Sequence, residues 1–491
     1  MLEKTNKVRV GLFANIVFGL GILFLISTLA VIMLNFSKYK FQYIFIATVL
    51  TLAGIGFFVC VLRLKPNIKT NIALVLFYLV VVLWTIESVL PIDPLIVIKP
   101  WDPKIFVDGK FPKFSDRRPK LKVIQDLRKQ NIAVYATVQP GFFLAEKKAD
   151  GKLSEILQIG NKRIFPLSNL SNSRLIFDRE RGEWQYFVSD EYGFNNPKGL
   201  HNPGQVDIAI IGDSYAQGMG VGPNDNLAGV MRKQFPRTIT FGIQGTGPLS
   251  QLAIFREYVE PLKPKAVIWV YYEGSDMPDF LWELKYPELS VYLDDPKYRQ
   301  NLRAIQPQID EILKLWLKNR ELSEFKEAKD KLSKEEWVER VKKTLKLARM
   351  RILLGVQFST KDYVIPCPPR CHFLPPEEPN PKLRMLLAQV QEKVKSWNGK
   401  LYFVSIPTRV RVREGVYNHN YDYSSHRDGQ LKTVEDLNIP LIDLYPVLLS
   451  HPDTMSLYRY RNWGHFNEAG YRFIAESILQ TIDQEIKKAS R

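Results

Sequence analysis

The chain of 491 residues is longer than one ordinary domain and has ample apolar material for a core. Its formal net charge is +17, of which residues 1–100 carry +6, with nine Lys or Arg against three Asp or Glu. A basic excess can indicate nucleic-acid binding, but no helix-turn-helix, zinc-finger or RNA-binding motif accompanies it. We therefore expect no nucleic-acid partner and attribute the charge to contact with anionic lipid headgroups or acidic glycans.

The first ninety residues contain nearly all of the long apolar runs. Residues 10–37 and 41–62 include no charged side chain, and a third run extends from about Thr70 to Leu90. Each run matches the roughly 20 residues that a helix needs to cross a bilayer core. The sequence predicts three transmembrane helices in residues 1–90, either as a simple anchor in the lipid bilayer or as a docking surface for a partner membrane protein.

Charge placement orients these predicted helices. Basic residues precede the first run and fill the loop between the second and third: Lys4, Lys7, Arg9, Arg63, Lys65 and Lys69. Such residues favour the cytoplasmic side of a membrane. We expect a cytoplasmic N-terminus and, after three crossings, an extracytoplasmic domain that is periplasmic or at the cell surface.

Residues 91–205 are interpreted as a small mixed α/β extracytoplasmic segment. A helix is predicted over 120–129, and two alternating runs, 174–178 and 184–188, predict a hairpin with its turn at 179–183. No catalytic motif occurs in this segment. We expect it to pack beside a catalytic sheet.

From residue 206 onward, predicted strands and helices alternate. Apolar strands are expected at 206–211, 238–241, 266–271, 400–406 and 440–443, which together predict an α/β domain with a parallel sheet over 206–491. An insert of about 278–363 interrupts the alternation with amphipathic helices. It either packs against the parent domain or forms a lid or glycan-binding arm.

A serine follows the first of these strands at the place where ligands bind in open α/β sheets. The strand ends at Gly212-Asp213-Ser214, at the carboxyl edge of the predicted sheet. A serine hydroxyl is a weak nucleophile unless a base removes its proton. His465, in the run Asn462-Trp-Gly-His465-Phe-Asn, is the candidate base.

These residues resemble the SGNH or GDSL-type hydrolase family, which has a flavodoxin-like sheet and a Ser-His-Asp catalytic set. Four family blocks occur in order: Gly212-Asp-Ser214, Phe241 to Gly247, Tyr272 to Asp276, and the block that holds His465. The resemblance implies that Ser214 is the nucleophile and His465 the base. It also implies an oxyanion hole built from Ser214, Gly245 and residue 275.

Two blocks depart from the family pattern. Ser275 stands where the family has an oxyanion asparagine, and Asn462 stands where it has the catalytic aspartate. The hydroxyl of a serine can donate a hydrogen bond, but its reach is shorter than that of an asparagine carboxamide. An asparagine can orient an imidazole, but it lacks the negative charge with which an aspartate stabilises an imidazolium. We expect Asn462 to orient His465. The alternative is Asp443, which ends the last predicted strand.

The resemblance implies an esterase or an O-acyltransferase, the latter like relatives that acetylate alginate and peptidoglycan outside the membrane. The expected substrate is an acyl ester or glycan of a polysaccharide or envelope component, and no cofactor is expected. Because two blocks depart from the pattern, the alternative is a catalytically weakened domain that binds glycan or serves as a partner-binding module.

The chain has three cysteines. Cys367 and Cys371 flank a short Pro-Pro-Arg loop, and with His372 alone nearby they are too sparse a ligand set for a metal site. In an oxidising compartment we expect them to form a disulfide. Cys60 lies inside an apolar run.

Overall fold

The structure is a computed structural model. It describes residues 2–34, 41–89, 116, 118, 120–144, 157–178, 180–181, 183–331, 379–414, 427–459 and 463–489. Two compact units are present, one with the N-terminal helices up to Pro103 and the other built from 104–328 and 366–491.

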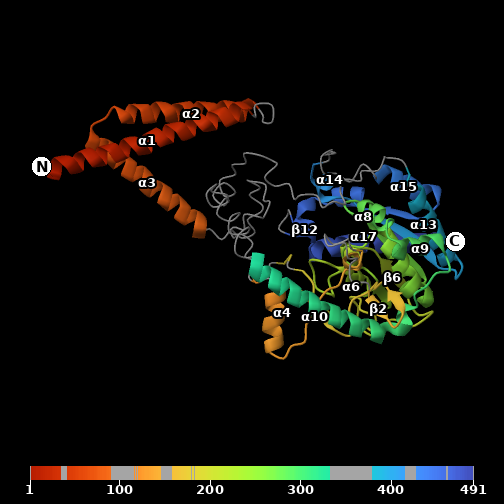
Figure 1. Ribbon diagram of the computed structural model, residues 1–491. Coiled ribbons are helices and arrows are strands. Elements are labelled where there is room, and N and C mark those ends of the chain that lie inside the picture. Colours follow the sequence, from red (N-terminus) through yellow and green to blue (C-terminus); the bar gives the residue numbers. More distant parts are fainter. Residues whose placement is uncertain are drawn as a thin grey trace. The chain divides into compact units, whose positions relative to one another are not determined.

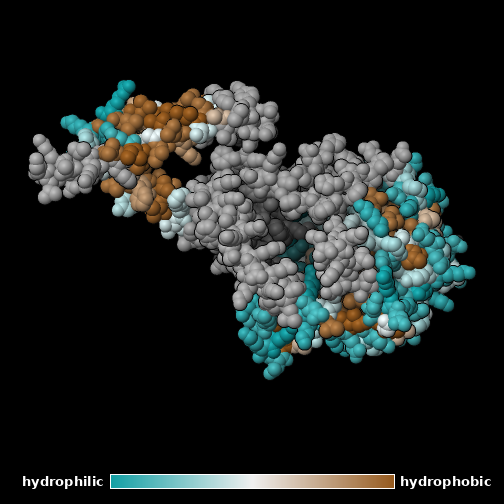
Figure 2. Space-filling view, in the orientation of Figure 1, coloured by the Kyte–Doolittle hydropathy of each residue, from teal (hydrophilic) through white to brown (hydrophobic). Residues whose placement is uncertain are grey.

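The first unit contains three helices, α1 (Leu2–Leu34), α2 (Phe41–Leu62) and α3 (Pro66–Val89). They pack together around Ala14, Phe18 and Val61. Many of their other apolar side chains point outward (Figure 2). Phe24, for example, is 71% exposed. So large an exposed apolar surface is typical of a helix group that contacts lipid or protein.

Within the described residues, one helical stretch, Pro66–Ile86, is both long and apolar enough to cross a membrane. The apolar stretches Ala14–Ser27 and Thr51–Leu62 are shorter. The structure thus offers one candidate span where the sequence predicts three, and the three-span anchor stays a prediction.

The second unit is organised around five parallel strands (Figure 1). Their order across the sheet is β10-β9-β8-β6-β7, which in chain order is 2-1-3-4-5, the flavodoxin arrangement. The predicted flavodoxin-like sheet is therefore confirmed. The strands are β6 (Ile208–Ile211), β7 (Thr238–Thr240), β8 (Ala266–Tyr272), β9 (Lys400–Ile406) and β10 (Leu441–Asp443).

The apolar run of β6 is buried on both faces because helices cover both sides of the sheet. Ala209 and Ile211 join one hydrophobic cluster, and Ile208 and Ile210 join the other. The first cluster includes residues of α7 (Pro248–Ile254), its π-helical and 3-10 continuation (Phe255–Val259, Glu260–Leu262), α13 (Pro381–Lys395) and α15 (Arg427–Asp436). The second includes residues of α5 (Ser214–Gln217), α6 (Leu227–Met231), α14 (Arg409–Glu414), α16 (Leu444–Leu449) and α17 (Glu468–Ala489).

The described part of the helical insert packs against the first cluster. It comprises α8 (Asp276–Glu283), α9 (Pro287–Asp294), a 3-10 turn (Leu302–Ile305) and α10 (Gln306–Lys331). Phe280, Tyr292 and Leu313 are buried there at 0% exposure. This portion is therefore a structural layer of the domain. Residues 332–363 of the insert lie outside the described residues.

The described residues between 116 and 205 belong to the same unit as the sheet. It contains α4 (Lys120–Lys129), a 3-10 turn (Pro140–Phe142), a β2–β3 hairpin (Leu157–Ile159, Lys162–Ile164) and a sheet of β1 (Tyr135–Ala136), β4 (Arg174–Ile176) and β5 (Tyr186–Val188). The antiparallel β4–β5 pair confirms the predicted hairpin.

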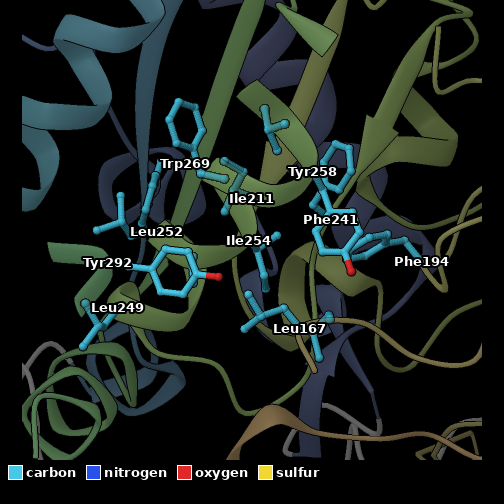
Figure 3. Packing of buried hydrophobic residues seen from close by; sticks show 14 of the residues in the cluster. Leu167, Phe194, Ile211, Phe241, Leu249, Leu252, Ile254, Tyr258, Trp269 and Tyr292 are labelled. Carbon is cyan, nitrogen blue, oxygen red and sulfur yellow. The ribbon is translucent and has the colours of Figure 1, made fainter. Parts of the chain in front are cut away.

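This segment shares its core with the large sheet. Phe194 is 1% exposed, and its ring lies 5.0 Å from the rings of both Phe241 and Tyr258 (Figure 3). Leu167 belongs to the same cluster as Trp269 of β8. The packing has no break at residue 205.

Substituting Phe194→Ala should therefore destabilise the whole unit. Loss of a fully buried aromatic side chain costs about 3–5 kcal/mol. The unit should unfold in one cooperative thermal transition, monitored by near-ultraviolet circular dichroism. The substitution should move the midpoint of this transition to lower temperature. Val188→Ala, at a side chain that is 54% exposed, is the control and should change stability by less than about 0.5 kcal/mol. Two transitions, with only one affected, would show that the segment folds independently.

Candidate active site

Ser214 is the first residue of the one-turn helix α5, directly beyond the end of β6. Asp213 caps this helix, because its Oδ1 accepts a hydrogen bond of 2.9 Å from the backbone N–H of Tyr215. A Cβ at Gly212 would lie 2.7 Å from Val270 O, so only glycine permits this close approach to β8. The turn holds the Ser214 hydroxyl at the carboxyl edge of the sheet.

His465 lies beside this serine, although 251 residues separate the two in the chain. Ser214 Oγ and His465 Nε2 are 2.8 Å apart. His465 lies on β12 (Trp463–Phe466), which pairs with β11 (Tyr458–Arg459) after a 3-10 turn (Thr454–Leu457). Its ring packs on Tyr215 with 4.4 Å between centroids. The sheet edge and this hairpin bring the expected nucleophile and the expected base into hydrogen-bond contact.

The other ring nitrogen of His465 contacts Glu180, in the turn between β4 and β5. Glu180 Oε1 lies 2.9 Å from Nδ1, and Oε2 accepts the backbone N–H of His465 at 3.0 Å. The turn is held by Asp178, whose Oδ1 accepts the Glu180 N–H at 2.7 Å and whose Oδ2 accepts the Gly220 N–H at 3.2 Å. Both oxygens of Glu180 are thus directed at the histidine.

Gly220 gives this carboxylate its space. Its φ is +88°, and a Cβ there would lie 3.2 Å from Glu180 Oε2. The N-terminal segment can place its acid against His465 because residue 220 has no side chain.

Glu180 and His465 stabilise each other's charged forms. Burial would raise the pKa of Glu180, but the charge of His465 and its hydrogen bonds outweigh burial and lower that pKa. Burial would likewise lower the pKa of His465, but the charge and hydrogen bond of Glu180 raise it above its ordinary value. An ionised Glu180 only accepts hydrogen bonds, so neutral His465 carries its proton on Nδ1 and leaves the Nε2 lone pair for the Ser214 hydroxyl.

The position that we expected Asn462 to hold is therefore occupied by Glu180. Asn462 itself lies outside the described residues. The alternative, Asp443, has both oxygens engaged elsewhere. Its Oδ1 accepts the Tyr445 N–H at 3.1 Å, and its Oδ2 pairs with Arg427. The carboxylate that contacts His465 thus comes from residues 91–205, where the sequence shows no catalytic motif, and no local motif marks Glu180.

The three expected oxyanion residues follow neighbouring strands at one edge of the sheet. Gly245 lies in the loop after β7 with φ +72°, and Gln217 Oε1 fixes this loop by accepting the Gln244 N–H at 2.7 Å. Ser275 precedes α8, just after β8. Its hydroxyl makes no hydrogen bond to any residue that the structure describes, so it is available to a ligand.

Buried Glu283 ties two of these loops together. From α8 it accepts hydrogen bonds from the backbone N–H groups of Gly247, Leu249 and Ser250, at the start of α7. Burial raises the pKa of this carboxyl to about 7, although the Ser250 hydroxyl and the N–H donors oppose the shift. The Gly245 loop and the Ser275 helix are thereby held together.

The structure does not test the expected disulfide. Cys367 and Cys371 lie outside the described residues. One group in the described part of the chain, Asp190, Glu191 and His201, has the donor atoms for a metal ion. Asp190 already accepts four hydrogen bonds from within the fold, from Tyr192 N, Phe194 N, Asn196 Nδ2 and the His201 ring. This group is accounted for as a buried hydrogen-bond network.

No protein-family model matches the chain, and no curated protein gives a significant match. Among solved structures it is similar to a lipase/acylhydrolase from Enterococcus faecalis at 12% identity, covering 57% of this chain and 96% of that one, with a TM-score of 0.30. An acetyl xylan esterase is 13% identical, the match covers 56% of this chain and 100% of that one, and the TM-score is 0.29. The psychrotrophic esterase EstA from Pseudoalteromonas sp. is 11% identical, the match covers 57% of this chain and 98% of that one, and the TM-score is 0.27.

The raised pKa of His465 predicts a pH dependence. As a base His465 must be neutral, so the rate of reaction with p-nitrophenyl acetate should rise with pH through a midpoint above the ordinary value of 6.5. In Glu180→Gln the anion is gone and burial remains, so the midpoint should move to lower pH. The maximal rate should fall by about 100- to 10,000-fold.

Glu183→Gln, at an exposed residue of the same turn, is the matched control and should leave the profile unchanged. An unshifted midpoint in Glu180→Gln would refute the assignment of Glu180.

Proposed function

We propose that this chain is a membrane-anchored serine esterase or O-acyltransferase of the SGNH/GDSL type. The observation that carries the proposal is the continuous hydrogen-bonded path from the Ser214 hydroxyl through His465 to Glu180. A nucleophile, a base and an orienting acid in this order are the parts that acyl transfer through a serine ester requires.

In the first half of the reaction, His465 Nε2 removes the Ser214 proton as Oγ attacks the ester carbonyl. Glu180 holds the imidazole and stabilises the imidazolium that forms. The tetrahedral intermediate then collapses, the bond to the leaving oxygen breaks, and His465 returns the proton to the departing alcohol. An acyl group remains on Ser214.

The developing oxyanion needs preorganised donors. The backbone N–H groups of Ser214 and Gly245, with the Ser275 hydroxyl, are proposed for this role. Loss of one such donor typically lowers the rate by on the order of 100-fold or more.

In the second half, an acceptor hydroxyl attacks the acyl-enzyme while His465 takes its proton. The bond between the acyl carbon and Ser214 Oγ then breaks, and His465 returns the proton to Oγ. Water as the acceptor gives an esterase, and a sugar hydroxyl gives an O-acyltransferase. We propose an ester of a polysaccharide or envelope component as the substrate, because the exposed apolar surface of α1–α3 suits a protein anchored beside such material.

The binding-module alternative depended on two departures from the family pattern. Glu180 supplies a carboxylate where Asn462 supplies none, so the first departure no longer argues against catalysis. Ser275 is the second departure from the family pattern. Its serine hydroxyl is a donor of shorter reach than a carboxamide.

A fluorophosphonate probe tests the proposal directly, because it reacts with activated serines. The full-length protein in detergent should be labelled, Ser214→Ala should abolish labelling, and His465→Ala should slow it by at least about 100-fold. Ser450→Ala, at an exposed serine that follows α16, is the control and should still be labelled. Absence of labelling in folded wild-type protein would favour the binding module.

The topology carries its own prediction. If three helices cross the membrane from a cytoplasmic N-terminus, an alkaline phosphatase fused after residue 491 should be active. A fluorescent protein that folds only in the cytoplasm, fused at the same residue, should be dark. The reverse pattern would place the serine site in the cytoplasm and remove the envelope substrate from the proposal.

A further inference from the structure

A second cavity, of about 570 Å³, lies in the unit that contains the sheet, away from Ser214. Its lining includes five cationic side chains, Arg256, Lys263, Arg299, Arg303 and Lys393, against two acidic ones, Glu257 and Glu260. The lining therefore carries a net charge of +3.

The two acidic side chains are already engaged. Glu257 accepts hydrogen bonds through both oxygens, from the Tyr292 hydroxyl and from the backbone N–H groups of Gln300 and Leu302. Glu260 pairs with Arg299 and, at 2.9 Å, with Lys393. Among the described residues, Arg256, Lys263 and Arg303 have no carboxylate within 4.0 Å.

Arg256 is the cation for which this excess of positive charge is least favourable, because it is buried. It is 4% exposed, and its guanidinium donates to two neutral acceptors, Asp295 O at 2.7 Å and Gln389 Oε1 at 2.6 Å. Burial, reinforced by the charge of Arg299, lowers the pKa of Arg256 to about 10. The charges of Glu260 and Asp295 act on Arg256 and oppose this shift, but they form no ion pair with it, so an anion in the cavity would stabilise the buried guanidinium further.

Arg303 and Lys263 are held toward the same cavity. The Arg303 guanidinium lies over the Tyr192 ring, 4.6 Å from its centroid, and its contacts with carbonyl oxygens are long, at 3.4 Å and 3.5 Å. Lys263 adopts a left-handed backbone with φ +49°, where glycine would be unstrained. This conformation ends the 3-10 turn Glu260–Leu262, and the Lys263 side chain lines the cavity.

The cavity is at the opposite edge of the sheet from the serine. Lys263 and Trp397, which line it, precede β8 and β9, whereas Ser214 follows the carboxyl end of β6. Strand β8 has seven residues, which at about 3.3 Å each separate the two edges by roughly 20 Å. A ligand in this cavity does not reach the Ser214 hydroxyl.

We propose that this cavity is an oxyanion-binding site, in which Arg256 and Arg303 bind a phosphate or carboxylate group and Lys263 adds charge at its rim. Arginine forks match the two oxygens of such groups. Trp397 offers an aromatic wall, since its indole is fixed by a 2.9 Å hydrogen bond to Pro264 O and stacks on Phe255. The site suits a phosphorylated or uronate-bearing sugar, and it does not depend on the activity proposed for Ser214.

Calorimetric titration of the full-length protein in neutral detergent tests the proposal with two probes, inorganic phosphate and glucuronate. At least one should bind with a dissociation constant below about 1 mM at low salt, and added NaCl should weaken binding. The stronger probe distinguishes a phosphate source from a carboxylate source.

Variants locate the site. Arg303→Gln and Lys263→Gln should each weaken binding by about tenfold, and the double variant by more, because charge-assisted hydrogen bonds are lost. Lys265→Gln is the matched control, because Lys265 pairs with Asp207 outside the cavity. Failure of both probes to bind, or binding that the double variant leaves unchanged, would overturn the proposal.

Discussion

The contact between Glu180 and His465 is the interaction on which the candidate site depends. It joins residues 285 positions apart, one in the β4–β5 turn and one on β12. Both oxygens are used, one on the imidazole and one on the backbone N–H of the same residue. The carboxylate therefore determines where the ring lies as well as which nitrogen carries the proton.

Several features of the fold serve this contact. Asp178 fixes the turn that carries Glu180, and Gly220 leaves room for the carboxylate. Leu167 and Phe194 pack the segment before β6 into the core that includes β8. This packing fixes the position of the β4–β5 turn relative to the sheet. Packing far from the site thus sets its geometry, because a buried ion pair is useful only when both partners are held in place.

The sheet and the nucleophile could be predicted because their signals are local. β-branched runs mark the strands, and Gly212-Asp213-Ser214 marks the turn where the backbone passes close to β8. Glu180 could not be predicted in this way. Its turn was correctly placed between two strands, but a glutamate in a polar turn has the same appearance whether it faces solvent or a histidine. The π-helical turn at 255–259 was missed for a related reason, since its apolar spacing continues that of α7.

The common core also bears on how this protein could be divided. The segment before β6 is not a passive spacer, because its β4–β5 turn contributes the carboxylate that contacts His465. A change that shifted the β4–β5 hairpin would withdraw the Glu180 carboxylate from His465, so the hairpin and the sheet have to be kept together in any truncated or chimeric protein.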